Sequence, residues 1–294
     1  MLATKPPWIT IRYQDNPTLR SIKEEVKSKG LATVCQESLC PNLSECWGSG
    51  TATFMLMGDT CTRGCRFCFV KTAAIPSPLN PDEPKLLLAA IQHMKLSYVV
   101  LTTVDRDDLP DQGAYHLAQC VKFLKKNLPH LKVEILIPDF RGDTELVKKI
   151  LDAKSDVIAH NLETVRRLTP KVRDRRASYD QSLTVLKFCN KFCPYTKSSL
   201  MVGHGETKEE ISQAMDDLRS VGVTFLTIGQ YLRPSHRQLE VQDYLTPDTF
   251  KYYESLGLSK GFLYVAAGPF VRSSYKAGEL FVEHLLKRGE DNAN

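Results

Sequence analysis

Short apolar segments alternate with amphipathic segments along most of this 294-residue chain. The apolar segments are rich in Val, Ile, Leu, Thr and Met, as strands are, and they span residues 53–57, 98–103, 133–137, 156–160, 199–202 and 223–228. The segments between and after them have helical periodicity, and they span residues 82–94, 111–127, 144–153, 180–192, 207–221 and 247–256. Strands that are regularly followed by helices predict a parallel sheet with helices packed on it.

The six repeats predict an α/β fold, a partial parallel (β/α)6 barrel of the TIM type. In such a barrel, functional side chains lie at the carboxyl ends of the strands. Polar residues follow five of the strands here, at positions 102–108, 138–142, 160–164, 203–206 and 229–231. We therefore expect one rim to hold the whole site. The barrel is expected at residues 51–259, with extensions at 1–50 and 260–294 that cap the active-site face.

Six of the nine cysteines form two triplets: Cys35, Cys40 and Cys46, then Cys61, Cys65 and Cys68. The second triplet offers three thiolates from one short loop, with no fourth cysteine or histidine close by in the sequence. A structural zinc site takes four protein ligands in a closed tetrahedron, so this loop fits zinc poorly. Three cysteines can instead hold three corners of a [4Fe–4S] cluster, which leaves the fourth iron open to a small ligand. The second triplet therefore predicts a reactive cluster.

Disulfides and core packing are the simpler interpretations of these six cysteines. The first eight residues are polar and contain no apolar signal segment, which favours a reducing compartment, where disulfides are rare. The cysteines also lie among Gly, Pro, Asn, Arg and Thr, without helix or strand periodicity. A zinc-stabilised binding module without turnover remains the alternative from another functional class. The remaining cysteines are expected to pack in the core: Cys120, Cys189 and Cys193.

Composition narrows the possible functions. The chain is 42% hydrophobic, enough for one large core, and no apolar run approaches the roughly 20 residues that cross a bilayer. The net charge is +5, and Lys and Arg are interspersed with Asp and Glu along the sequence. This charge allows a nucleic-acid partner without indicating one, and an acidic protein partner would fit it equally well. The absence of targeting signals predicts a cytoplasmic location, with an organellar mature form as the alternative.

The spacing of the second triplet resembles the signature of the radical S-adenosylmethionine superfamily. Other motifs extend the resemblance across nearly the whole chain: CQESLCPNLSEC at 35–46, VDRDDLP at 104–110, HNLET at 160–164, RDRRA at 173–177, GQY at 229–231 and RSSY at 272–275. Together these motifs resemble the lipoyl synthase family. Another radical enzyme that inserts sulfur is the alternative within the same chemistry, and the first triplet and the serine motif argue against it.

The resemblance implies insertion of two sulfur atoms, at carbons 6 and 8 of an octanoyl chain that is amide-linked to a carrier-protein lysine. These C–H bonds are unactivated, so radical chemistry has to be delegated to a cofactor. In the family, one [4Fe–4S] cluster cleaves S-adenosylmethionine to a 5′-deoxyadenosyl radical, which abstracts hydrogen. A second, auxiliary [4Fe–4S] cluster donates the sulfur.

The resemblance also implies roles for individual residues. The catalytic cluster would be held by Cys61, Cys65 and Cys68, and the auxiliary cluster by Cys35, Cys40, Cys46 and a serine. Ser274 is favoured over Ser273 as this fourth ligand, and a weakly bound alkoxide suits a cluster that is dismantled. Ser274 and its neighbour Arg272 are the expected catalytic residues. The residues expected around S-adenosylmethionine are Thr102, Thr103, Asp105, Asn161, Glu163 and, for its carboxylate, Arg175.

The implied partners follow from the same resemblance. They are octanoylated lipoyl domains of 2-oxoacid dehydrogenases, the glycine cleavage H protein, and a ferredoxin or flavodoxin-type reductant, with no nucleic acid and no membrane. One residue departs from the expected pattern, because His204 stands where the family is expected to have an apolar residue. This difference concerns contacts near the nucleotide more than the reaction.

Overall fold

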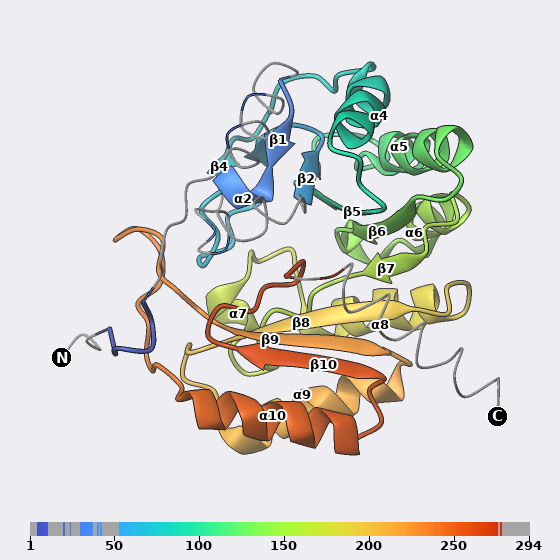
Figure 1. Cartoon of the computed structure of the whole chain (residues 1–294). Coiled ribbons are helices and arrows are strands. Elements are labelled where there is room, and N and C mark those ends of the chain that lie inside the picture. Colours follow the sequence, from blue (N-terminus) through green and yellow to red (C-terminus); the bar gives the residue numbers. More distant parts are fainter. Residues whose placement is uncertain are drawn as a thin grey trace, which may run out of the picture.

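The computed structural model describes residues 5–10, 20, 24, 30–37, 40, 42, 53–275 and 277 (Figure 1). Eight strands form one sheet in the order β1-β2-β5-β6-β7-β8-β9-β10. Their bounds are β1 (Ala32–Thr33), β2 (Thr53–Leu56), β5 (Tyr98–Thr103), β6 (Lys132–Leu136), β7 (Val157–Ala159), β8 (Thr196–Val202), β9 (Phe225–Gln230) and β10 (Tyr264–Gly268). All neighbours are parallel except β1 and β2, which pair antiparallel.

Helices connect successive strands of this sheet. Their bounds are α2 (Val34–Glu37), α4 (Glu83–His93), α5 (Ala114–Asn127), α6 (Thr144–Leu151), α7 (Thr169–Val172), α8 (Tyr179–Asn190), α9 (Lys208–Ser220) and α10 (Pro247–Ser259), with a 3₁₀ turn η1 (Phe140–Gly142). Figure 1 shows the longer helices on the outer side of the curved sheet. Two short strands, β3 (Thr60–Cys61) and β4 (Lys71–Thr72), pair outside the main sheet.

This architecture confirms the predicted fold class. The strand order follows the chain order from β2 to β10, as expected for repeated right-handed βαβ units. In the described residues the sheet stays open, with β1 and β10 at its edges. The sequence did not predict β10, which begins after residue 259 and pairs with β9. Two further segments with a helical sequence pattern, residues 18–28 and 277–288, lie largely outside the described residues, and so does Cys46.

Local sequence explains where several helices begin. Thr207 and Glu210 form a reciprocal capping box at the start of α9, and Ser178 caps α8 by accepting a hydrogen bond from the Gln181 amide. Helix α10 begins at Pro247, whose missing N–H is not needed in a first turn. Strands β2 and β9 are buried along their whole length, as expected for parallel strands covered on both faces.

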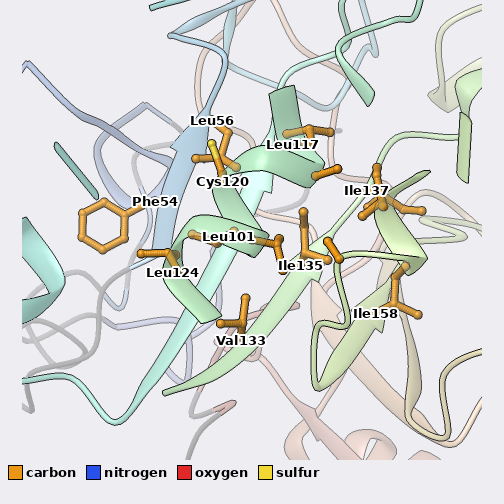
Figure 2. Packing of buried hydrophobic residues seen from close by; sticks show 14 of the residues in the cluster. Phe54, Leu56, Leu101, Leu117, Cys120, Leu124, Val133, Ile135, Ile137 and Ile158 are labelled. Atoms are coloured by element: carbon orange, nitrogen blue, oxygen red, sulfur yellow. The ribbon is translucent and has the colours of Figure 1, made fainter. Parts of the chain in front are cut away.

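A large hydrophobic cluster lies between the strands β2, β5 and β6 and the helices α4 to α6 (Figure 2). Leu101 and Ile135 project from the sheet toward Leu117 and Leu124 of α5, and all four are fully buried. Cys120 packs among them, which confirms its predicted place in the core; Cys189 and Cys193 are buried free thiols in the same cluster. No helix in the described residues is both long and apolar enough to cross a bilayer.

Candidate active site

A cavity of about 490 Å³ lies at the carboxyl ends of the parallel strands. Its wall includes Thr103 at the end of β5, Pro138 after β6, Met201 in β8 and Tyr231 after β9. This is the rim that the strand-end polar residues predicted. The residues predicted to contact cofactors that line this cavity are Cys40, Cys61, Cys65, Cys68, Thr102, Thr103, Asp105, Asn161, Glu163 and Arg272.

The three cysteines of the second triplet share the wall of this cavity. The amides of Arg63 and Asp105 donate to Cys61 Sγ at 3.4 and 3.3 Å. The amide of Asp174 donates to Cys65 Sγ at 3.3 Å. Burial raises the pKa of both thiols to about 12, so they are neutral without a cation, and metal coordination would deprotonate them. Three neighbouring thiols with N–H donors to their sulfurs fit a [4Fe–4S] cluster held at three corners.

Arg63 anchors the loop that carries these cysteines. Its guanidinium lies 2.8 Å from the carboxylate of Asp107, 2.8 Å from that of Asp139 and 3.4 Å from that of Asp105. Burial by itself would raise the pKa of Asp107, but the hydrogen bonds and charge of Arg63, together with hydrogen bonds from Arg141 and Thr62, outweigh burial and lower the pKa to about 2. The loop backbone also joins the end of β5 directly, because the Thr62 amide donates to the Asp105 carbonyl at 2.9 Å.

Asn161 and Glu163 follow β7 and form the second wall of the cavity. Glu163 is held with a φ of 69°, an uncommon backbone conformation for a residue other than glycine, by amide hydrogen bonds with Ser199 and Met201 of β8. Burial raises the pKa of the Glu163 carboxyl. The Asn161 side-chain oxygen is buried and has no hydrogen-bond partner among the described residues. A buried acceptor beside a carboxyl group fits the two hydroxyls of a ribose.

The structure places Arg173, and not Arg175, at the cavity. Arg173 is buried and donates from Nη1 to Ser182 Oγ at 2.7 Å. His160 continues this chain: its Nδ1 donates to the Ile137 carbonyl, and its Nε2 accepts from the Ser182 hydroxyl, both at 2.9 Å. Burial lowers the pKa of His160 to about 4, so the ring is neutral and Arg173 carries the positive charge into the cavity. Arg175 is exposed and lines a different hollow.

Cys40 of the first triplet and residues of the serine motif line another side of the cavity. Cys35 is buried on α2, and Cys40 lines the cavity and donates its amide hydrogen to the Cys35 carbonyl at 3.0 Å. Asn42 hydrogen-bonds the Phe270 carbonyl, which joins the amino-terminal segment to the serine motif. Ser273 lines the cavity beside Arg272; Ser274 is partly buried and is not among the lining residues.

A glycine makes this approach possible. A Cβ atom at Gly229 would lie 2.0 Å from the Val271 carbonyl oxygen, closer than any real contact allows. Any larger residue would therefore push the segment that carries Arg272 and Ser273 away from β9. This explains the glycine of the GQY motif physically.

Comparison with known proteins agrees with these features. The family model described as the Radical SAM superfamily matches residues 55–218. The lipoyl synthase of Anaeromyxobacter sp. (strain Fw109-5) is 55% identical to this chain over 97% of its length and 98% of the relative. The mitochondrial lipoyl synthase of Aedes aegypti is 53% identical over 98% of this chain and 75% of the relative.

The chain belongs to the lipoyl synthase family. Among solved structures, methylornithine synthase superposes with a TM-score of 0.56 at 14% identity, over 84% of this chain and 71% of that chain. This likeness supports the α/β fold alone. The family relationship supports [4Fe–4S] clusters and S-adenosylmethionine as cofactors, and it gives a chemical reason for Cys40 and the three cysteines of the second triplet to line one cavity.

Some cavity residues of this lipoyl synthase family member were missed at the sequence level. Arg63, Asp139 and Tyr231 line the cavity without having been assigned a role. Arg63 lies between Cys61 and Cys65 in the sequence, and this position was the available signal for it. The role of Asp139 depends on its contact with Arg63, which is distant in sequence and could not be read from spacing.

His204 lies behind the cavity wall and not in it. The centroid of its ring lies 4.3 Å from that of Tyr231, and neither ring nitrogen has a hydrogen-bond partner in the part of the chain that the structure describes. Burial, followed by the nearby Lys171, lowers the pKa of His204 to about 4. The unfolded chain then binds more protons than the folded chain between about pH 6.5 and pH 4, so this histidine destabilises the fold as the pH falls through that window.

We expect His204→Leu to raise the free energy of unfolding at pH 7 by about 1 kcal/mol, because two unpaired buried nitrogens are removed. The variant should also lose less stability than the parent between pH 6.5 and pH 4. Urea unfolding at pH 7 and pH 5 measures both effects, with His130→Leu at an exposed position as the control. An unchanged dependence of stability on pH would contradict the prediction.

Proposed function

We propose that this chain is a lipoyl synthase that inserts sulfur at carbons 6 and 8 of an octanoyl group on a carrier-protein lysine. The observation that carries the proposal is that Cys40 of the first triplet and all three cysteines of the second triplet line one cavity. A sulfur-donating cluster and a radical-generating cluster must both reach the same alkyl chain, so their ligands must share one chamber. The named relatives support the same reaction.

S-adenosylmethionine at an open-corner [4Fe–4S] cluster supplies the radical that abstracts hydrogen from the octanoyl chain. The residues of this chain position the reactants. Asn161 and Glu163 bind the ribose hydroxyls, because they combine an unpartnered acceptor with a buried carboxyl group. Arg173 binds the methionine carboxylate in place of Arg175, since of these two arginines only Arg173 is buried and lines the cavity. Thr102, Thr103 and Asp105 complete this wall.

The rest of the cavity suits an alkyl chain and excludes water from it. Its apolar lining comes from several elements and includes Val34, Met55, Phe67, Leu136, Ile137, Leu200 and Val271. The alkyl chain has no group near these C–H bonds that can form a hydrogen bond, so apolar packing has to orient carbons 6 and 8. Water exclusion also protects a reactive intermediate from side reactions.

The carrier is an octanoylated lipoyl domain of a 2-oxoacid dehydrogenase or the glycine cleavage H protein. Lys5 and Arg233 line the same cavity, and they supply positive charge for an acidic carrier that presents its modified lysine there. The reductant is an acidic carrier of the ferredoxin or flavodoxin type. Some relatives are named mitochondrial and others, of bacterial origin, are not, so the cytoplasmic location stays a prediction.

The test begins with metal content. After anaerobic reconstitution, we expect roughly eight irons with matching sulfide per chain, as two [4Fe–4S] clusters require, and formation of lipoyl product from an octanoyl-lysine peptide with dithionite. Roughly four irons with S-adenosylmethionine cleavage but no lipoyl product would instead indicate another radical enzyme. Zinc without iron would overturn the enzymatic proposal in favour of a binding module.

The fourth ligand of the auxiliary cluster is proposed to be Ser274, with Ser273 as the alternative. Ser274→Ala is expected to lower lipoyl formation at least tenfold while S-adenosylmethionine cleavage persists, because only the auxiliary cluster loses a ligand. Ser273→Ala, one residue away, is the matched control and should have the milder effect. The reverse order of the two variants in the product assay would assign the ligand to Ser273.

A further inference from the structure

A second hollow, of about 540 Å³, lies on the other side of the loop that carries the second cysteine triplet. Thr62 and Gly64 of that loop form part of its wall. The other lining residues are Thr72, Ala73, Ala74, Asp107, Asp108, Arg141, Arg175 and Arg176. Thr62 and Gly64 do not line the first cavity, and Cys61, Cys65 and Cys68 do not line the hollow. The loop therefore separates the two spaces, with its thiols on the cavity side.

The hollow is connected to the cysteines by short hydrogen-bonded paths. Arg176 donates from Nη2 to the Thr62 carbonyl at 2.7 Å and from Nε to the Asp174 carboxylate at 2.8 Å. Asp174 in turn accepts from the Gly64 amide and donates its own amide hydrogen to Cys65 Sγ at 3.3 Å. A molecule that contacts Arg176 is thus separated from Cys65 Sγ by two residues, Arg176 and Asp174, and by the two hydrogen bonds that join them to each other and to the sulfur.

In this hollow the carboxylates are more buried than the guanidinium groups. The carboxylate of Asp107 at its base is 3% exposed, whereas the side chains of Arg141 and Arg176 above it are 52% and 32% exposed. Arg175 is also exposed, and the structure assigns its guanidinium no carboxylate partner among the described residues. The five charged side chains of the lining sum to a charge of +1, and the guanidinium groups of Arg141 and Arg176 are more exposed than the carboxylates of Asp107 and Asp108, of which the second is 14% exposed. An approaching molecule therefore meets guanidinium groups first. An acidic surface fits this arrangement.

The electron required by the proposed reaction has to arrive from outside the cavity. During turnover the cavity holds S-adenosylmethionine and the octanoyl chain, so it leaves no room for a second protein. The hollow offers a free approach to the same loop from the opposite side. This argument rests on the proposed function, because only a cluster that is reduced needs a donor.

We propose that this arginine-lined hollow is the docking site of an acidic one-electron carrier protein. The reduced cofactor of the carrier loses one electron, and the cluster held by the second triplet gains it; no bond is made or broken. Arg141, Arg175 and Arg176 orient the carrier through charge, and the Arg176–Asp174 contact lies between the two redox centres. Arg175 thereby acts in docking and not in binding of S-adenosylmethionine.

Arg175→Glu tests this site most directly, because no described contact of the folded chain depends on this side chain. With flavodoxin as the probe, the variant is expected to bind about five- to tenfold more weakly at low salt and to reduce its cluster correspondingly more slowly. With dithionite as the reductant, S-adenosylmethionine cleavage and lipoyl formation should equal those of the parent. Arg175→Lys should restore most of the flavodoxin affinity.

Lys122→Glu, an equal charge reversal on the exposed side of α5, is the matched control and should leave flavodoxin binding unchanged. Equal losses with flavodoxin and dithionite would place Arg175 at the cofactor and overturn the docking proposal. Weaker binding of the octanoylated carrier, with flavodoxin binding intact, would assign the hollow to that partner instead. Failure of the parent protein to form lipoyl product with dithionite would contradict the proposed function and leave the measured flavodoxin affinity as a separate result.

Discussion

Cys65→Ala is expected to abolish cleavage of S-adenosylmethionine, whereas Cys40→Ala retains cleavage and loses sulfur insertion. Cys65 contributes one of the three thiols of the loop. Its sulfur also accepts a hydrogen bond from the Asp174 amide, which joins the loop to the segment between α7 and α8. Removing it takes one of three corners from a cluster that already lacks a fourth protein ligand. Cys40 belongs to the segment that is hydrogen-bonded to the serine motif, so its loss leaves the loop of the second triplet intact.

The two variants should therefore separate two activities that the parent couples. Methionine and 5′-deoxyadenosine report cleavage, lipoyl-peptide reports sulfur transfer, and iron content should fall from roughly eight to roughly four in each variant. Cys193→Ala is the control, because this buried free thiol packs in the core away from the cavity and should keep all the iron. Cleavage by Cys65→Ala at the parent rate would overturn the assignment of the second triplet.

Local periodicity was enough to predict the six central strands and their helices. Each of these strands is a short apolar run, so it can be recognised from local sequence. Each also pairs with the next strand of the sheet along the chain, so its partner can be inferred from chain order. Strand β10 escaped prediction because Tyr264–Gly268 ends in small residues, Ala-Ala-Gly, and is recognised as a strand only through its pairing with β9. The partners of an edge strand are not encoded in its own periodicity.

The cavity residues divide in the same way. The cysteine spacing and the alternation of Asn161 with Glu163 are local features, and both groups line the cavity as the sequence suggested they would. The arginine proposed to bind the carboxylate of S-adenosylmethionine could not be identified from local sequence. Helix α7 ends at Val172 and α8 begins at Tyr179, so Arg173 and Arg175 lie in an irregular segment where no period indicates which side chain points inward. The hydrogen bond from Arg173 to Ser182, which itself contacts His160, holds the Arg173 side chain inward.

Long-range ion pairs were the least predictable part of the site, and Arg63 is the clearest example. Its three carboxylate partners come from the segments after β5 and β6, more than 40 residues away along the chain. The side chains of Arg63, Asp107 and Asp139 are 3%, 3% and 0% exposed. Charges buried to this degree are stable only as a group, since each one removed leaves the others without compensation.

We therefore expect Arg63→Met to lower the free energy of unfolding by about 3 to 5 kcal/mol, even though methionine matches the apolar part of the arginine side chain. The carboxylates of Asp105, Asp107 and Asp139 would lose their shared cation. The pKa of Asp107, now about 2, would rise, so the stability that this group contributes above about pH 4 would be lost. Urea unfolding at pH 7 of the metal-free protein measures the loss.

Arg66→Met, three residues along the same loop, provides the comparison. Arg66 is exposed, and its side chain makes one long hydrogen bond, to the Lys171 carbonyl at 3.4 Å, so a change within about 0.5 kcal/mol is expected. If both substitutions had equally small effects, the buried carboxylates would not depend on Arg63. If Arg63→Met alone is destabilised and also binds less iron on reconstitution, then the ion-pair network sets the shape of the cysteine loop before any metal is bound.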